Sequence, residues 1–140
     1  MLKYDKGNYK DRTILSSGQT ACIEFSITDA FGNFPYDYYC TFAIADKKKH
    51  INAWLENRRN PLTGVSTGKC GLEGLAWAWE RVLEMETLLA EKHMACRIII
   101  QGEDAKRMRV YRKHCCRYGY REAAHPRSGR FLFKIIPANN

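Results

Sequence analysis

The chain has 140 residues, of which 45% are hydrophobic and 27% are charged, and its formal net charge is +8. This length suits a single domain over residues 1–140, and the apolar fraction is that of a folded chain. No apolar run approaches the roughly 18 residues of a membrane-spanning helix, and the polar stretch from Met1 to Lys10 differs from a signal peptide. We therefore expect a cytoplasmic protein without a membrane partner.

The positive charge is concentrated at the C-terminal end of the chain. Residues 1–96 contain 12 basic and 12 acidic residues, whereas residues 97–140 contain 11 basic and 3 acidic residues. Such a cluster attracts anions, whether cofactor phosphates, a nucleic acid or an acidic protein. The alternative is a solvated basic helix face.

The first half of the chain predicts two strands. Apolar and polar residues alternate over 21–28, which indicates a half-buried strand. Residues 38–45 are rich in aromatic and β-branched types and predict a second strand, antiparallel to the first, after a loop over 29–37. Residues 1–20 are polar, and only Ile14-Leu15 suggests a short element.

The segment after residue 45 is ambiguous. Ile51, Trp54 and Leu55 have helical spacing, whereas Ile51, Ala53 and Leu55 would share one face of a strand. We favour the helix, followed by a loop over 57–66 that contains Pro61 and Gly64.

A long helix is predicted from Leu72 to Lys92. Its apolar residues at helical spacing, which we expect to face the core, are Leu72, Leu75, Ala76, Trp79, Val82, Leu83 and Leu89. Trp77 lies among carboxylates, and we expect it to pack against another chain or another element.

The C-terminal half alternates strands and helices. A continuous apolar run at 96–101 indicates a strand buried on both faces. Asp104 can cap a basic helix that reaches Arg117 and turns Met108, Tyr111 and Cys115 inward, and Gly119 would end it. Two strands, at 120–123 and 131–136, complete the chain. The predicted fold class is α/β or α+β, with a mixed central sheet, flanking helices and a C-terminal β-hairpin.

The six cysteines are scattered through apolar segments and form no CxxC pair. Without a secretory signal, this pattern is typical of small buried hydrophobic residues in a reducing compartment. His93 and Cys96 are spaced like metal ligands, but no complete ligand motif is present. We therefore expect no metal site.

The loop before the long helix could bind an anion. Residues 63–71 read TGVSTGKCG, and amides at a helix N-terminus bind phosphate, here assisted by the charge of Lys69. The nucleotide-binding pattern GxxxxGK[ST] is not met, because Thr63 replaces its first glycine and Cys70 replaces its hydroxyl residue. ATP or GTP binding is therefore not expected, and a plain loop capped by Ser66 or Thr67 is the alternative.

Over residues 64–136 the chain resembles the GCN5-related N-acetyltransferases. The likeness rests on a glycine-bearing loop entering a long helix, a buried strand, a Tyr-bearing helix that ends in Gly-Tyr, and a closing hairpin. It implies a fold of that family and acetyl-CoA as cofactor, with Tyr111 protonating the departing thiolate. The residues that it implies for the cofactor pyrophosphate are Thr67, Gly68, Lys69, Cys70, Gly71 and Leu72. The short chain is similar to acetyltransferase-like proteins of tailed bacteriophages.

Two functions follow from these observations. In the first, an amine substrate attacks the acetyl thioester, and Glu56, with Glu24 as the weaker alternative, accepts the proton of the amine. In the second, the chain is a non-catalytic interaction protein or a virion-associated phage protein. Its basic C-terminal face would then bind a protein or a nucleic acid, with Tyr111, Tyr118 and Tyr120 interleaved among the cations.

Overall fold

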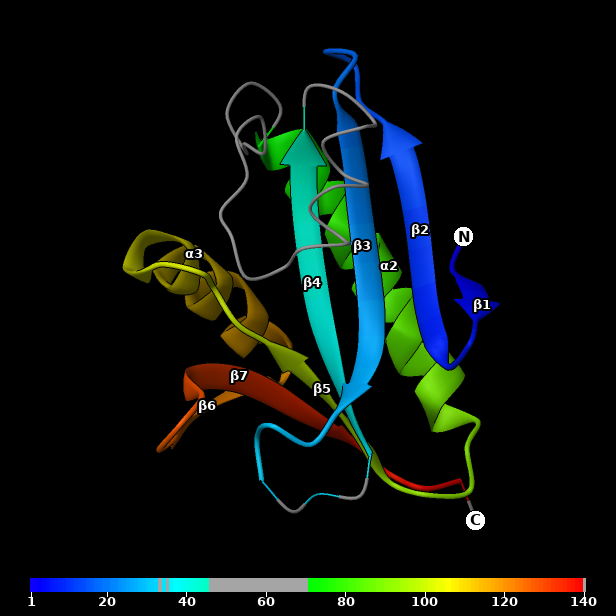
Figure 1. The fold of residues 1–140 in the computed structure, drawn as a ribbon, viewed down its shortest axis with the longest axis vertical. Coiled ribbons are helices and arrows are strands. Elements are labelled where there is room, and N and C mark those ends of the chain that lie inside the picture. The colour runs from blue at the N-terminus through cyan, green and yellow to red at the C-terminus, as the bar shows by residue number, and fades with distance from the viewer. Residues whose placement is uncertain (33, 35, 46–70, 140) are drawn as a thin grey trace. The chain divides into compact units, whose positions relative to one another are not determined.

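A computed structural model of the 140-residue chain describes residues 1–32, 34, 36–45 and 71–139. The described part forms a seven-stranded sheet with the strand order β1-β2-β3-β4-β5-β7-β6, together with two α-helices and one short 3-10 helix (Figure 1). Strand β4 pairs with β5 in parallel, whereas β5–β7 and β6–β7 are antiparallel. The predicted mixed sheet of an α+β protein with a C-terminal hairpin is confirmed, although the described helices number only two.

The elements are β1 (Lys3–Asp5), β2 (Asn8–Ile14), β3 (Thr20–Thr28), β4 (Asp37–Ala45), α2 (Gly71–Ala90), β5 (Cys96–Ile100), α3 (Ala105–Cys115), η1 (Cys116–Tyr118), β6 (Arg121–His125) and β7 (Gly129–Ile136). Their contacts group the chain into two compact units. The first comprises residues 1–24 and 41–85, and the second comprises residues 25–40 and 86–140. Strands β3 and β4 and helix α2 contribute residues to both units. The single domain over 1–140 stays a prediction.

The first unit begins with a hairpin that the sequence did not predict. Strands β1 and β2 pair antiparallel, with Asp5 opposite Asn8. Lys6 and Gly7, which join them, both have positive φ angles of 52° and 89°, the backbone of a tight hairpin turn. The strand residues Lys3–Asp5 are polar and exposed, so they carry no hydrophobic alternation that would reveal a strand.

The predicted strands at 21–28 and 38–45 are confirmed as β3 and β4. Figure 1 shows them as neighbouring arrows of opposite direction, as predicted. The expected half-burial of β3 is wrong, because Thr20–Phe25 are buried on both faces of the strand, including Cys22 and Glu24. Alternation along a strand therefore did not mean that one of its faces meets water.

The long helix α2 is confirmed, and its predicted inward stripe is partly right: Val82 and Leu89 are buried as predicted, whereas Leu72, Ala76 and Leu83 are exposed. The buried residues are Gly74, Ala78, Val82, Met85 and Leu89, whereas Leu72 is 86% exposed and Leu83 is 43% exposed. The small residues at the start of this stripe allow a close approach: a Cβ at Gly74 would overlap Cδ1 of Ile44 and lie 3.4 Å from Cζ of Phe42. The face of α2 that packs against Ile44 and Phe42 therefore carries small residues at its start, and larger apolar residues such as Leu72 lie on other faces.

Trp77 packs against another element of the same chain. Its half-buried indole contacts the core cluster of Leu15, Ala21 and Ile44. The guanidinium of Arg81 lies 5.9 Å from the ring centroid, within the range of a cation–π contact. The prediction of a packing partner is thus met within the first unit.

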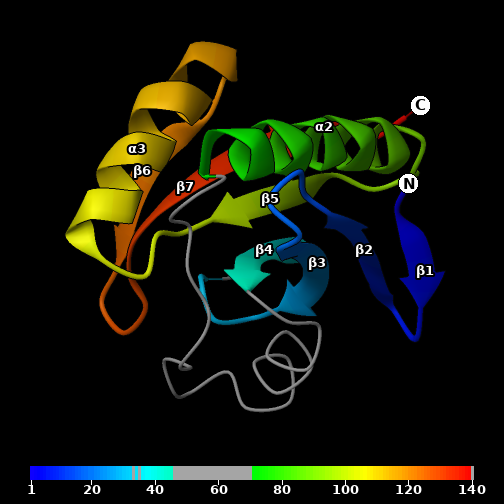
Figure 2. The ribbon, with the colours of Figure 1, turned by 90° about the horizontal axis from the view of Figure 1, so that it is seen from above.

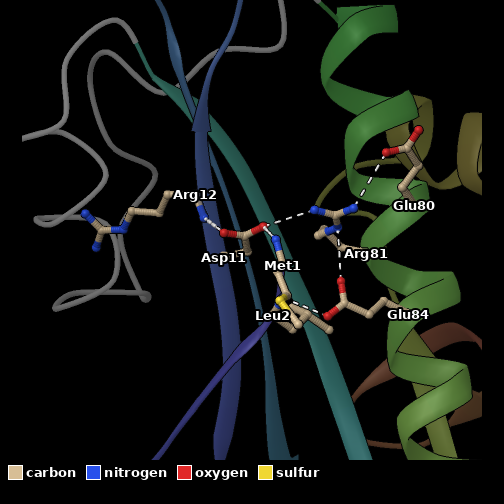
Figure 3. Close-up of polar contacts among 7 residues, drawn as sticks. All are labelled: Met1, Leu2, Asp11, Arg12, Glu80, Arg81 and Glu84. Carbon is tan, nitrogen blue, oxygen red and sulfur yellow. Dashed lines mark hydrogen bonds and ion pairs between the residues drawn. The ribbon is translucent and has the colours of Figure 1, made fainter.

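Arg81 connects α2 to the N-terminal hairpin (Figure 3). Its Nη1 donates to Oδ2 of Asp11 at 3.2 Å, and its Nε lies 3.5 Å from Oε1 of Glu84. The other oxygen of Glu84 accepts the backbone N–H of Leu2 at 2.8 Å. Both carboxylates therefore join the helix to residues of the hairpin or just before it.

Asp11 collects several donors at this point. The α-ammonium of Met1 donates to it at 2.6 Å, the backbone N–H of Arg12 at 2.8 Å, and Arg81 as above (Figure 3). Burial raises the pKa of Asp11, but the hydrogen bonds from these donors outweigh that effect and hold the pKa below its usual value.

The second unit is built around β5. Ile98 and Ile99 are fully buried, which confirms the predicted strand with two covered faces. Ile99 packs with Phe31 and Phe131 in one core cluster. In the sheet, β5 pairs with β4 on one side and with β7 on the other.

A buried ion pair joins β4 to β5 in this unit. Asp37 and Arg97 are directly opposite in the parallel register, and Nε and Nη2 of Arg97 donate to the two carboxylate oxygens at 2.7 and 2.8 Å. Asp37 is fully buried, and the Arg97 guanidinium lies 5.0 to 5.9 Å from the ring centroids of Phe34, Phe131 and Phe133. The sequence contained no sign of this pair, because its members are 60 residues apart.

The end of the chain follows the prediction closely. The side chain of Asp104 caps α3 by accepting the N–H of Arg107 at 2.8 Å. Gly119 ends the helical segment with a φ of 93°, a conformation that favours glycine. Strands β6 and β7 form the predicted hairpin, and β7 begins two residues earlier than expected, at Gly129.

Candidate active site

The cofactor residues implied by the family resemblance lie around the start of α2. Residues 67–70 and the candidate base Glu56 lie outside the described residues, so their roles stay predictions. Gly71 and Leu72 form the first turn of α2. Leu72 is 86% exposed, and no described atom beyond the adjoining chain and the helix backbone lies within 4 Å of the position of a Cβ at Gly71. This turn is therefore open within the described part of its unit.

Tyr111 lies in the second unit, on the inward face of α3 as predicted. Its side chain is half-buried, between the buried Met108 and Cys115 along the helix. Burial is the main cause that raises the pKa of Tyr111 to about 12, and the charge of Cys40 adds to it against the attraction of Arg107. The phenol therefore keeps its proton at neutral pH.

Two cysteine thiols lie near this phenol. Cys40 is the last residue of β4 that pairs with β5, opposite Ile100, and it interacts electrostatically with both Tyr111 and Cys115. Burial raises the pKa of Cys115 to about 12 and that of Cys40 further still. Neither thiol is a nucleophile at neutral pH, since the thiolate is the reactive form.

A second polar group extends this cluster, and the sequence did not reveal it. The Tyr120 hydroxyl donates to Oε2 of Glu86 at 3.1 Å, and Nζ of Lys134 donates to Oε1 at 2.8 Å. Burial, followed by the charge of Glu86, strongly raises the pKa of Tyr120, so this phenol is a fixed donor. Glu86 is one of several glutamates on α2, and nothing in their spacing separates it from the others.

An open depression of about 340 Å³ lies beside Lys134. It is lined by Gly119, Arg121, Phe133, Lys134 and Ile135. Two of the five lining residues, Arg121 and Lys134, are cationic, which makes the depression suited to an anionic or aromatic group.

Raising the pH to 10 should lower the stability of this protein. The folded-state pKa is about 11 for Cys22 and about 12 for Cys115, above the usual value of 9.0 for a free thiol. A raised pKa contributes stability below pH 9 that is lost as the pH rises through the folded-state value, by about 1 kcal/mol per thiol at pH 10. Urea unfolding at pH 8 and pH 10 measures this loss.

The matched variants separate the thiols from other titrating groups. Cys115→Ala should reduce the loss between the two pH values, whereas Cys116→Ala should not, because Cys116 is exposed. An equal pH dependence in Cys115→Ala and the unmodified protein would contradict this assignment.

Gly71 and Leu72 belong to the first unit, and Tyr111 belongs to the second. Across the described residues, no three His, Cys, Asp or Glu side chains are grouped so that they could hold a metal ion. No described helix is long and apolar enough to cross a membrane. Comparisons with protein-family models, with curated proteins and with solved structures find no match.

Proposed function

We propose that this chain is an N-acetyltransferase that transfers the acetyl group of acetyl-CoA to an amine. The observation that carries the proposal is the position of Tyr111, which is half-buried on the inward face of α3 and lies near Cys40. Cys40 is where the parallel pairing ends, because the register runs from Asp37 opposite Arg97 to Cys40 opposite Ile100, while β4 continues to Ala45. The resemblance to the acetyltransferase family implies that acetyl-CoA binds between the strand before the long helix and the strand after it.

The order of the described elements supports the same proposal. Strand β4 precedes α2, β5 follows it, α3 carries Tyr111, and β6–β7 close the chain. The short helix η1, which continues α3, ends at Gly119. These are the features on which the resemblance to GCN5-related N-acetyltransferases rests. We accordingly retain Thr67, Gly68, Lys69, Cys70, Gly71 and Leu72 as the proposed cofactor-binding residues and Glu56 as the proposed base.

When bound, acetyl-CoA supplies an acetyl group already activated as a thioester. The backbone N–H groups of Gly71 and Leu72 have no partner within α2, since they belong to its first turn, and are suited to phosphate oxygens. Tyr111 donates a hydrogen bond to the sulfur that leaves. Because a phenol with a pKa of about 12 is a weaker acid than a thiol of pKa ~8.5, hydrogen bonding rather than complete proton transfer is its main contribution.

Isothermal titration with acetyl-CoA tests the binding step. We expect saturable binding that Gly68→Tyr weakens, because a bulky side chain would obstruct the approach of a pyrophosphate to the loop amides. Ala76→Tyr, on an exposed position of α2, is the control and should bind normally. No heat of binding at millimolar acetyl-CoA would overturn the proposal.

Tyr111→Phe tests the chemical step. Removing the hydroxyl should lower turnover roughly a hundredfold, the smaller end of the loss that follows removal of one hydrogen-bond donor to developing charge, while acetyl-CoA affinity changes little. CoA release over a panel of polyamines, lysine peptides and peptide α-amines measures turnover. Tyr118→Phe, at a tyrosine that is 49% exposed, is the control.

Unchanged turnover in Tyr111→Phe would remove Tyr111 from the reaction. A lower turnover accompanied by a lower urea midpoint would indicate a structural effect instead. Binding of acetyl-CoA without turnover of any amine would favour the non-catalytic interaction protein.

A further inference from the structure

The basic residues of the C-terminal region divide into a paired set and an unpaired set. Each of the three acidic residues after position 96 has an arginine partner: Glu103 and Asp104 pair with Arg107, and Glu122 pairs with Arg112 and Arg130. Asp37 and Glu86, from outside that region, pair with Arg97 and Lys134. The basic residues without an ion pair to a described residue are Lys106, Arg109, Lys113, Arg117, Arg121 and Arg127, and all are exposed.

Four of the unpaired cations form a line, which we call the cationic stripe: Lys106, Arg109, Lys113 and Arg117. Their spacing of three, four and four residues places the first three on one face of α3, and Arg117 continues the line into η1. The stripe is roughly 16 Å long at the rise of an α-helix. It lies opposite the inward residues Met108, Tyr111 and Cys115.

This arrangement destabilises the isolated helix. Like charges three or four residues apart cost about 0.2–0.5 kcal/mol per pair, and the ion pairs of Glu103, Asp104 and Glu122 are made with arginines outside the stripe. Two other arginines of the same helix do have carboxylate partners: Arg107 pairs with Glu103, and Arg112 pairs with Glu122. The carboxylates near α3 therefore pair with arginines outside the stripe. An unbalanced line of cations is suited to a linear polyanion.

Aromatic and apolar surface follows at the C-terminal end of the stripe. Tyr118 is 49% exposed, and its ring contacts that of His114 at 5.2 Å between centroids. The depression lined by Gly119, Arg121 and Phe133 comes directly after it along the chain. Figure 2 shows α3 beside β6 and β7, the strands that carry Arg121 and Phe133.

We propose that the cationic stripe, with Tyr118 and the adjoining depression, binds single-stranded nucleic acid. The cations bind successive phosphates, and the Tyr118 ring stacks on an unpaired base. A duplex keeps its bases stacked inside and an acidic peptide has none, so neither would use the ring. The surface is independent of the proposed acetyl transfer, because Tyr111 lies on the opposite face of α3.

Fluorescence anisotropy with a labelled oligothymidine of about 16 nucleotides tests the proposal. Changing Lys106, Arg109, Lys113 and Arg117 together to glutamine should weaken binding at least tenfold. It should also flatten the dependence of log K on log salt by about 3, since each phosphate contact to a single strand contributes ~0.7. The control changes Lys3, Lys6, Lys10 and Lys92 to glutamine, which removes the same charge elsewhere and should leave binding within threefold.

Tyr118→Ala tests the stacking contact without changing the charge. It should weaken binding at least fivefold and leave the salt dependence unchanged, because a stacked base contributes about 1–3 kcal/mol. The urea midpoint of Tyr118→Ala should match that of the unmodified protein, and that of the quadruple glutamine variant should match or exceed it, since all five residues are exposed and the glutamines remove the repulsion within the stripe.

Several results would overturn the proposal. These are no binding of the oligothymidine at low salt, equal losses in the two glutamine variants, competition by polyglutamate as strong as by unlabelled oligothymidine, or a duplex bound as tightly as the single strand.

Discussion

Asp37→Ala should lower the free energy of unfolding by about 3 kcal/mol, because it leaves Arg97 charged in a largely buried position. The Arg97 side chain is only 13% exposed, and among the described residues it would retain one side-chain hydrogen bond, of 3.3 Å to the carbonyl of Phe31. Its three aromatic neighbours cannot accept its N–H groups as a carboxylate does. Urea unfolding with linear extrapolation measures the change.

Two variants control this result. Asp37→Asn keeps the size and one acceptor, so it should lose less than the alanine variant while still losing stability. Asp5→Ala breaks an exposed ion pair with Lys10, in which the Asp5 side chain is 52% exposed and that of Lys10 is 42% exposed. This variant should lower the free energy of unfolding by less than about 0.5 kcal/mol. If Asp37→Ala cost no more than Asp5→Ala, the pair between β4 and β5 would not be a structural contact.

Gly102→Ala should also destabilise the protein, by about 2 kcal/mol, the middle of the usual range for overpacking. Gly102 lies between β5 and the N-cap of α3, and an added Cβ would overlap the backbone N of Met108. It would also lie 2.7 Å from Cα of Met108 and 2.8 Å from the carbonyl carbon of Arg107. Backbone atoms cannot rotate away, so the first turn of α3 would have to shift.

Gly71→Ala is the matched control, since no neighbouring atom of the described residues lies within 4 Å of its added Cβ. It should leave the urea midpoint within experimental error or raise it slightly, because alanine favours the helix. A Gly102→Ala variant as stable as Gly71→Ala would show that α3 can move freely at its start. Equal m-values would confirm that both variants unfold the same structure.

Local chemistry explains the parts of the fold that the sequence predicted well. Strand β5 was recognisable from an uninterrupted apolar run, and α3 from a capping aspartate at one end and a glycine at the other. These signals act over a few residues and need no partner elsewhere in the chain. Tyr111 was placed on the inward face of α3 for the same reason, because helical spacing alone determines that face.

The failures concern contacts with distant segments. The buried stripe of α2 runs through Gly74 and Ala78 because Ile44 and Phe42 approach the helix there, a fact that apolar spacing within the helix cannot express. The strand β1 carries no hydrophobic pattern, since its three residues are polar and exposed. The hydrogen bonds of Glu86 join α2 to Lys134 in β7 and to Tyr120, the residue before β6, so no local pattern in the sequence marks Glu86.

The net charge of +8 illustrates the difference between what the sequence determines and what the tertiary structure determines. The sequence by itself determined its size and its confinement to the residues after position 96, because charge is a property of composition. Only the tertiary structure decided which cations are neutralised, since Asp37 meets Arg97 through strand register and Glu86 meets Lys134 across 48 residues. Ion pairing depends on distances of a few ångströms between segments that folding brings together. The exposed line from Lys106 to Arg117 is therefore a product of the fold.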